Sequence, residues 1–232
     1  MRSRLQQGRD EQRRRILDAA RELFGARSFD DVTMAAVAER AGVARATVFN
    51  HFPGKHALVE AITEEVLSYW AGMLEHALAD EETATPALVR ALFAHMGEGI
   101  AHYYGFYRGV FREIAKLQVG LEEGSGAARA RATAFERLIR LLARGQARGE
   151  LRADVEAIDL ARAFDSLSNG TINQWLFDDT SGALEQRMER AVDIYLGAVA
   201  LGASEARAAA VVKLPAPPRA RPRRVPRTRR SR

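Results

Sequence analysis

The stretch from Thr33 to Lys55, TMAAVAERAGVARATVFNHFPGK, decides the fold of this chain. Thr33 is a favourable helix N-cap, and the apolar residues after it recur at helical spacing until Gly42. Glycine at that point tolerates the left-handed backbone that ends many helices. A second short helix is expected over residues 44–52, because a Pro-Gly pair follows it. The stretch therefore predicts two short helices joined by a tight glycine turn.

The second of these helices has side chains that suit the major groove of double-stranded DNA. Val48 and Phe52 are expected to turn inward and anchor the helix. Arg45, Ala46 and Asn50 then point outward, where no bulky neighbour obstructs them. Arginine matches the major-groove edge of guanine, and asparagine matches that of adenine. This face predicts the reading of base edges, the alternative being an ordinary solvated helix face.

Thr33 and Lys55 are expected to hold phosphates. Each stands at the start of a predicted helix, where backbone N–H groups and the helix dipole favour an anion. Contacts of this kind fix the register of a protein on DNA and carry no sequence preference.

The rest of the chain is predicted to be all-α. Proline and glycine rarely interrupt residues 9–201, and apolar residues recur there at helical spacing. We expect an N-terminal three-helix helix-turn-helix domain followed by a C-terminal helical bundle, with about nine helices in all. The helices are expected at about 10–25, 34–41, 44–52, 55–78, 86–103, 106–119, 127–148, 155–176 and 184–201.

Charge is distributed unevenly along the chain. The net charge is +3 over residues 1–60 and −7 over residues 61–212, and residues 213–232 carry nine basic and no acidic residues. Five of the seven prolines also lie after residue 212, so we expect residues 202–232 to form a disordered basic tail. This tail either adds nonspecific DNA affinity through counterion release or is a solvated extension without a role.

The run from Ile16 to Ala61 resembles the N-terminal domain of TetR-family regulators. The matching strings are ILDAARELF, the helix start at residues 33–38, AGV at the turn, TVFNHFPGK and HALVEAI. For His51, which the resemblance directs to the phosphate backbone together with Lys55, the alternative is a partly buried residue without a DNA partner. The residues that the resemblance places at or near DNA are Thr33, Arg45, Ala46, Thr47, Asn50, His51 and Lys55.

Two residues depart from the pattern of the family. Phe49 stands where a tyrosine is usual, so a hydroxyl that often reaches phosphate is missing and Phe49 is expected only to pack. Ala44 stands where a serine commonly caps the helix, a loss of about 1 kcal/mol of local helix stability.

A homodimer on a palindromic operator is expected, because one small helix-turn-helix buries too little surface to select a site in a genome. The last two helices are expected to pair as a four-helix interface, which the resemblance also implies. The alternative is that their apolar residues fill the core of one subunit. The residues assigned to this interface are Ile158, Ala161, Phe164, Ile172, Trp175, Leu176, Met188, Ala191, Val192, Tyr195, Leu196 and Val199.

A concentration of aromatic residues between positions 93 and 111 favours an apolar pocket with a few polar groups. The resemblance implies that a small, largely apolar effector binds there and releases the DNA. The alternative is ordinary core packing. The candidate pocket residues are Trp70, Phe93, Met96, Tyr103, Tyr107, Phe111, Phe164 and Trp175.

Other classes of function find little support in the sequence. Without cysteine there is no disulfide or thiolate site, and no P-loop, dinucleotide fingerprint or nucleophile motif occurs, so we expect no enzyme, cofactor or metal. The absence of a long apolar run favours a cytoplasmic protein without a membrane partner. The expected organisation is a DNA-binding domain over 10–70, a ligand-sensing and dimerisation domain over 71–201, and the tail over 202–232. The sequence therefore predicts a ligand-released repressor, the alternative being a nonspecific nucleic-acid-binding protein that acts through its tail.

Overall fold

A computed structural model describes residues 4–119, 124–177 and 183–201, and within these ranges the chain is all-α, as predicted. None of the helices in the described ranges combines the length and the apolar character needed to cross a bilayer. The predicted tail over 202–232 lies outside the described residues. The helices are α1 (Arg4–Ala26), α2 (Met34–Ala41), α3 (Arg45–His51), α4 (Lys55–Ala79), α5 (Thr85–His102), α6 (Tyr104–Val119), α7 (Gly126–Ala147), α8 (Ala157–Phe177) and α9 (Leu184–Val199).

Most helices begin and end within two residues of their predicted bounds, and α1 is the exception. It begins at Arg4, well before residue 10. The prediction relied on the apolar stripe that starts at Ile16, and the residues before that stripe are mostly polar and exposed. A polar, solvated turn of helix leaves no periodic apolar signal in the sequence.

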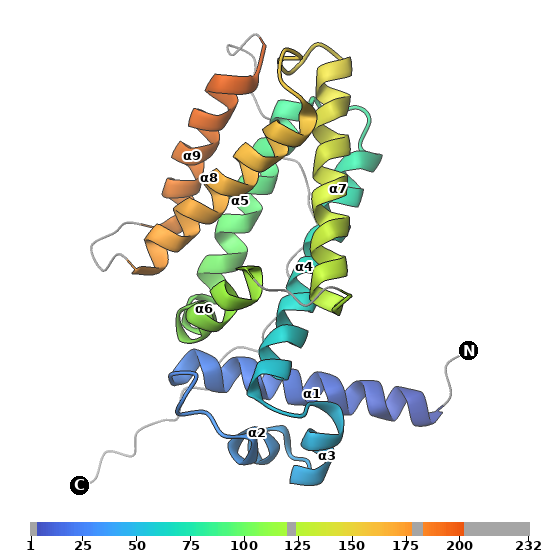
Figure 1. The fold of residues 1–232 in the computed structure, drawn as a ribbon, viewed down its shortest axis with the longest axis vertical. Helices are drawn as coiled ribbons and strands as arrows, with labels where there is room; N and C mark the ends of the chain where they lie inside the picture. Colours follow the sequence, from blue (N-terminus) through green and yellow to red (C-terminus); the bar gives the residue numbers. More distant parts are fainter. Residues whose placement is uncertain (1–3, 120–123, 178–182, 202–232) are drawn as a thin grey trace, which may run out of the picture.

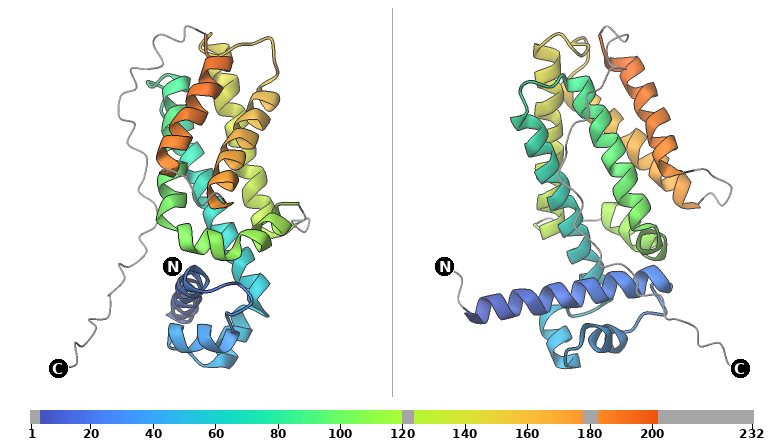
Figure 2. Two further views of the ribbon diagram at one scale, coloured as in Figure 1. Left: turned by 90° about the vertical axis from the view of Figure 1, so that its left-hand side faces the viewer. Right: turned by 180° about the vertical axis from the view of Figure 1, so that it is seen from behind.

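The molecule has a small head and a taller body (Figure 1). Helices α1, α2 and α3 form the head, and α4 runs from the head into the body, where it lies beside α7. Helices α5, α8 and α9 pack together on the other side of the body, and α6 lies across its base against α1. From behind, the N-terminal part of α1 projects beyond the rest of the head (Figure 2).

Three arginines, two on α7 and one directly after it, bind the backbone of α4 and the turn after it. Arg137 donates to the carbonyl of Ala71 at 2.8 Å, and Arg144 donates to that of Leu78 at 3.0 Å. One turn further, Arg148 reaches the carbonyl of Glu81 at 2.9 Å. Leu78 lies in the last turn of α4, where carbonyls have no partner within the helix, so Arg144 supplies a hydrogen bond that α4 itself cannot. Arg137 bonds a carbonyl inside α4, and Arg148 bonds one in the turn that follows it.

Two hydrophobic clusters fill the molecule, and the head cluster includes part of the body. Phe106 and Val110 of α6 are buried among the residues of α1 to α4. Tyr107 packs against both clusters. Helix α4 contributes to both as well, through Leu58 in the head and Met73 in the body. The predicted boundary at residue 70 therefore falls inside a helix that the two clusters share.

Helices α1 and α6 approach each other backbone to backbone through glycine residues. A Cβ atom added to Gly105 would lie 2.6 Å from the carbonyl oxygen of Gly25. A Cβ atom added to Gly109 would overlap the carbonyl oxygen of Phe24. We call this contact the glycine seam. Because a backbone cannot move aside as a flexible side chain can, the seam fixes α6 firmly against the end of α1.

Replacing Gly109 with alanine should destabilise the protein by about 1–3 kcal/mol, because the new methyl group must push α6 away from α1. Urea-induced unfolding followed by circular dichroism measures this change. Gly72 of α4 is the matched control, since a Cβ atom there meets no atom within 4 Å. Gly72→Ala should leave stability unchanged or raise it. Equal stability of the Gly109→Ala variant and the wild type would show that the seam yields readily.

Candidate DNA-binding surface

The turn between α2 and α3 is held by backbone geometry and by one arginine of α1. Gly42 ends α2 in the left-handed conformation, with φ of 64°, and its N–H group bonds the carbonyl of Glu39 at 3.1 Å. Arg15 donates to the carbonyls of Ala41, at 2.6 Å, and Gly42, at 2.9 Å. These bonds satisfy the last carbonyls of α2 and fix the direction in which the chain leaves it. The role of Arg15 was not predicted, because a bond between residues 26 positions apart leaves no local pattern in the sequence.

Helix α3 is anchored by its inner residues, as predicted. Val48 is fully buried and Phe52 is 4% exposed, both inside the head cluster. Of the predicted DNA-facing residues, Arg45, Ala46 and Asn50 are exposed and Thr47 and His51 are half-buried. Ala44 makes no side-chain cap, as expected from its lack of a hydroxyl. The result is a short helix with a solvated outer face.

Phe49 departs from its expectation. The side chain was expected only to pack, yet it is 52% exposed and stands on the outer face of α3. Val48 and Phe52 take the inner side of the helix, and Phe49 lies about 100° around the helix from Val48, so its ring faces outward.

His51 lies at the end of α3 in a partly desolvated, cationic setting. Burial, and then the charges of Arg9 and Arg13, lower the pKa of its imidazole below the ordinary value. The ring also lies 6.1 Å from that of Phe52, centroid to centroid. This lowered pKa favours the neutral imidazole in the free protein, whereas an approaching phosphate would favour the protonated form.

Lys55 already has partners inside the head. Its ammonium group donates to the carbonyls of Phe29, at 2.8 Å, and Asp30, at 3.2 Å. It also lies 4.6 Å from the centre of the Phe29 ring. These two bonds fix the loop between α1 and α2. Because a lysine ammonium group has three donors, one N–H bond remains for a further acceptor. This structural task was not predicted.

A pair of arginines on α1 fixes the head against α4. Glu65 accepts from Arg13 at 3.1 Å and also pairs with Arg21. Arg13 in addition lies 5.5 Å from the centre of the Phe52 ring, which anchors the end of α3. The orientation of α3 thus depends on α1 and α4 together.

Several of the candidate effector residues make aromatic contacts with one another or with their neighbours in the body. Phe93 and Phe164 are buried and meet each other in a T-shaped contact with centroids 4.6 Å apart. Trp175 meets Tyr104 at 4.8 Å, and Trp70 lies edge-on to His95.

The other candidates are half-buried or undescribed. Met96 and Tyr103 are half-buried, and burial raises the pKa of the Tyr107 phenol well above its ordinary value. Phe111 belongs to α6, but its side chain is outside the described part of the chain. An effector role for these residues stays a prediction.

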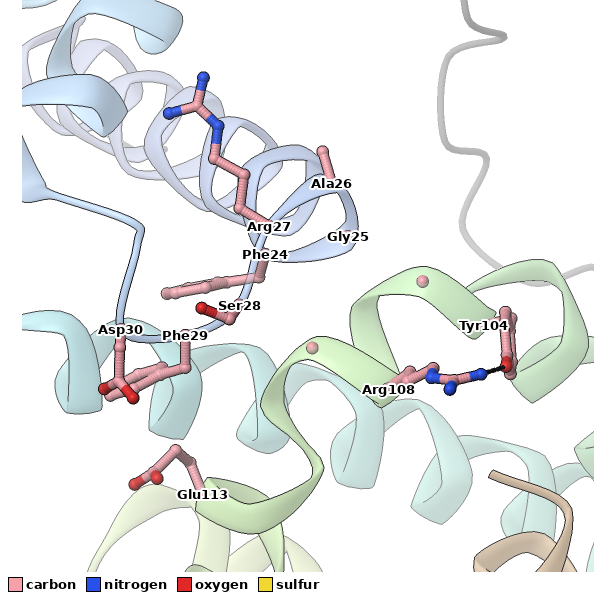
Figure 3. A pocket seen from close by; sticks show the side chains of 12 residues that line it. Phe24, Gly25, Ala26, Arg27, Ser28, Phe29, Asp30, Tyr104, Arg108 and Glu113 are labelled. Carbon is pink, nitrogen blue, oxygen red and sulfur yellow. Dashed lines mark hydrogen bonds between the residues drawn. The ribbon is translucent and has the colours of Figure 1, made fainter. Parts of the chain in front are cut away.

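A cavity of about 640 Å³ lies between the end of α1, the loop that follows it and α6 (Figure 3). Its lining includes Phe29 and Asp30 from the loop and Tyr104, Arg108 and Glu113 from α6. Arg108 bonds the hydroxyl of Tyr104. None of the eight candidate effector residues lines this cavity. It adjoins the glycine seam, where the head meets the body.

The residues assigned to the dimer interface are mostly wrong. Ten of the twelve are buried in the core of the single subunit, and Ile158 and Trp175 are half-buried. Their apolar character is thus already used by the packing of α8 and α9 on α5 and α7. The outer faces of α8 and α9 carry a different set: Ala163, Ser166, Gly170, Gln174 and Phe177 on α8, and Arg190, Ile194, Gly197 and Ala198 on α9, all exposed.

Family models match most of the chain. The model described as bacterial regulatory proteins of the tetR family matches residues 16–62. The model described as the C-terminal domain of SbtR-like transcriptional regulators matches residues 86–197. The first match runs from within α1 to within α4, and the second spans most of α5 to α9.

Individual relatives agree with these models. The chain is 37% identical over 109 residues to the uncharacterized HTH-type transcriptional regulator YvkB of Bacillus subtilis, covering 45% of this chain and 53% of YvkB. The chain thus spans about half the length of YvkB and less of other curated relatives.

Solved structures show the same fold. That of SmeT, the repressor of a Stenotrophomonas maltophilia multidrug efflux pump, has a TM-score of 0.66 at 23% identity over 88% of this chain and 97% of that one. Thermus thermophilus FadR, a repressor solved with lauroyl-CoA, has a TM-score of 0.58 at 24% identity over 89% of this chain and 99% of that one.

Replacing Thr33 with alanine should lower the stability of the head. The hydroxyl of Thr33 accepts from the N–H group of Ala36 at 3.1 Å, and loss of such a cap costs about 1 kcal/mol. Thermal unfolding of the Thr33→Ala and Thr33→Ser variants measures the effect, and Thr33→Ser should retain the stability of the wild type. Equal losses in both variants would assign the effect to the methyl group of Thr33.

Proposed function

Because the chain belongs to the TetR family of bacterial regulatory proteins, we propose that it binds a palindromic DNA operator as a homodimer and releases it when a small molecule binds. The observation that carries this proposal is the outer face of α3. Arg45, Ala46 and Asn50 are exposed there over a buried anchor. A short helix after a tight turn, with free arginine and asparagine side chains, has the form and the chemistry of a major-groove reader.

Three further residues would hold the phosphate backbone beside this face. Thr33 stands at the start of α2, and Lys55 stands at the start of α4 with one donor left over. The pKa of His51 is lowered in the free protein, and a phosphate beside it would raise that pKa and so couple DNA binding to proton uptake. These contacts would position the protein and leave the choice of sequence to α3.

The second subunit would pair through the outer faces of α8 and α9. Ile194 is 67% exposed on α9, and the neighbouring positions Gly197 and Ala198 are small. A Cβ atom added to Gly170 of α8 or to Gly197 meets no atom within 4 Å, so both positions lie open to solvent. Small residues around an exposed isoleucine allow two helices to approach closely, and a self-complementary face of this kind suits two-fold pairing.

Helix α6 would transmit the binding of the ligand to the head and so cause the release of DNA. This helix lies between the body and the head, and Phe106 and Val110 bind it into the head cluster. A ligand that displaces α6 from the body side therefore moves α1 through the glycine seam. Such a ligand must bind the DNA-incompetent arrangement more tightly, and bound DNA must weaken its affinity by the same factor.

The effector would be a small, largely apolar molecule. The half-buried Trp70, Met96 and Trp175 pack against the body cluster and offer apolar surface with a few polar atoms, and the half-buried Tyr103 packs against the head cluster. The structural neighbour FadR was solved with lauroyl-CoA, which supports an effector with an apolar chain for a body of this shape.

The function is tested by selecting genomic fragments that the full chain binds at about 150 mM salt, where weak surface contacts are screened. We expect an enriched inverted repeat. Enrichment without a shared sequence would contradict the proposal and favour the nonspecific alternative.

On the selected operator, Arg45→Ala should reduce the ratio of specific to nonspecific affinity by about tenfold, since an arginine–guanine pair is lost. Fluorescence anisotropy with operator and unrelated DNA measures this ratio. Lys55→Ala should weaken both affinities about equally and flatten the salt dependence. It should also lower the unfolding temperature, because its bonds to the loop after α1 are lost.

The matched control for Arg45→Ala is Arg140→Ala, which removes an exposed arginine from α7 in the body. This variant should keep both affinities. If Arg45→Ala weakened operator and unrelated DNA equally, Arg45 would be a phosphate contact and not a reader of bases.

The dimer is tested by Ile194→Glu, which places a charge at the centre of the proposed interface. We expect a monomer with an intact fold, measured by sedimentation equilibrium and circular dichroism, and a loss of operator affinity of at least about a hundredfold. Ala143→Glu adds the same charge at an exposed position of α7 and should stay a dimer. A dimeric Ile194→Glu variant would show that the subunits pair through another surface.

A further inference from the structure

Phe49 is the exposed aromatic residue of the head. Among the described residues, four large hydrophobic side chains are exposed: Phe49, Phe177, Ile194 and Leu201. The last three lie on α8, on α9 or directly after α9, where the proposed partner subunit would cover them. Phe49 lies on α3, far along the chain from that surface, so the proposed dimer does not explain why its ring is exposed.

Phe49 occupies the middle of the outer face of α3. At about 100° per residue, the exposed positions 45, 49, 46 and 50 follow one another around the helix in that order. Phe49 and Ala46 therefore form an apolar centre, with Arg45 on one side and Asn50 on the other. A surface that reads DNA with its two polar side chains also presents a phenyl ring between them.

A phenyl ring in that place suits an apolar group on the base edges of the major groove. It has no donor for a phosphate oxygen, so it cannot replace the tyrosine hydroxyl there. The major-groove edges of guanine, cytosine and adenine offer polar atoms at their centre, whereas thymine offers its 5-methyl group. A ring that is half-exposed to water in the free protein gains free energy when it covers that methyl group.

We infer that Phe49 contacts the 5-methyl group of a thymine in each half-site and so selects thymine at that position. The inference rests on the proposed function, because it requires that α3 enter the major groove. It adds a third base-reading residue to Arg45 and Asn50, and one that reads shape and apolar surface without a hydrogen bond.

The test exchanges thymine for uracil, which removes the 5-methyl group and keeps the base pair. The full chain is titrated with a set of operators. Each operator carries uracil at one thymine position, and the exchange is made at that position in both half-sites. For the wild type we expect one position to lose about fourfold in affinity per half-site, the effect of one methyl-sized group. Phe49→Ala should bind the thymine and uracil forms of that operator equally.

Two further variants serve as controls. Phe49→Tyr keeps the ring and should keep the preference for thymine. Asn50→Ala weakens binding through the neighbouring position and should also keep the preference, which shows that weaker binding alone does not remove it. Because half of the Phe49 side chain is exposed, Phe49→Ala should unfold at the temperature of the wild type.

The outcomes separate this inference from the function on which it rests. If no inverted repeat is selected, the proposed function itself is contradicted. If a repeat is selected but no uracil exchange lowers the affinity of the wild type, only the role of Phe49 is overturned. The same holds if Phe49→Ala keeps the full preference for thymine.

Discussion

The left-handed turn at Gly42 is the constraint on which the DNA-facing surface depends. It ends α2 after eight residues and leaves the last carbonyls without partners in the helix. Arg15 donates hydrogen bonds to two carbonyls at this end. The chain must then leave in one direction, which brings Val48 and Phe52 over the head cluster. Once these two are buried, the helical repeat alone decides that positions 45, 46, 49 and 50 face outward. The chemistry of the surface follows from the turn.

The second organising feature is that the head does not end where its sequence motif ends. Phe106 and Val110 complete its core from α6, and Glu65 of α4 pairs with Arg13 and Arg21 of α1. A short helix-turn-helix has little core of its own, so contacts from distant parts of the chain supply the missing stability. The same contacts join the head to α4 and α6, so under the proposed function a change in the body would reach α3 through these two helices.

The sequence predicted the features that depend on neighbouring residues. The turn at Gly42, the cap at Thr33 and the bounds of α2 to α9 follow from short-range patterns, and the structure confirms them, whereas the polar start of α1 was missed. It did not predict the bonds of Arg15 and Lys55, which join residues at least 25 positions apart. It also assigned the wrong residues to the interface. An apolar stripe such as that of Met188 and Val192 indicates that this side of a helix is buried, but not whether the same subunit or a partner subunit buries it. The exposed face of small residues around Ile194 has a weaker sequence signal and needed the packed subunit to be found.

The shared core limits how far this protein can be treated as two exchangeable modules. A hybrid regulator made by grafting residues 1–70 onto an unrelated sensor would carry the helix-turn-helix but leave behind the α6 residues that close its core. Its α1 would end against a foreign backbone, without the glycines that let α6 approach. An engineer who wants this DNA specificity in a new biosensor therefore has to graft α6 together with the head and place the joint on the far side of that helix.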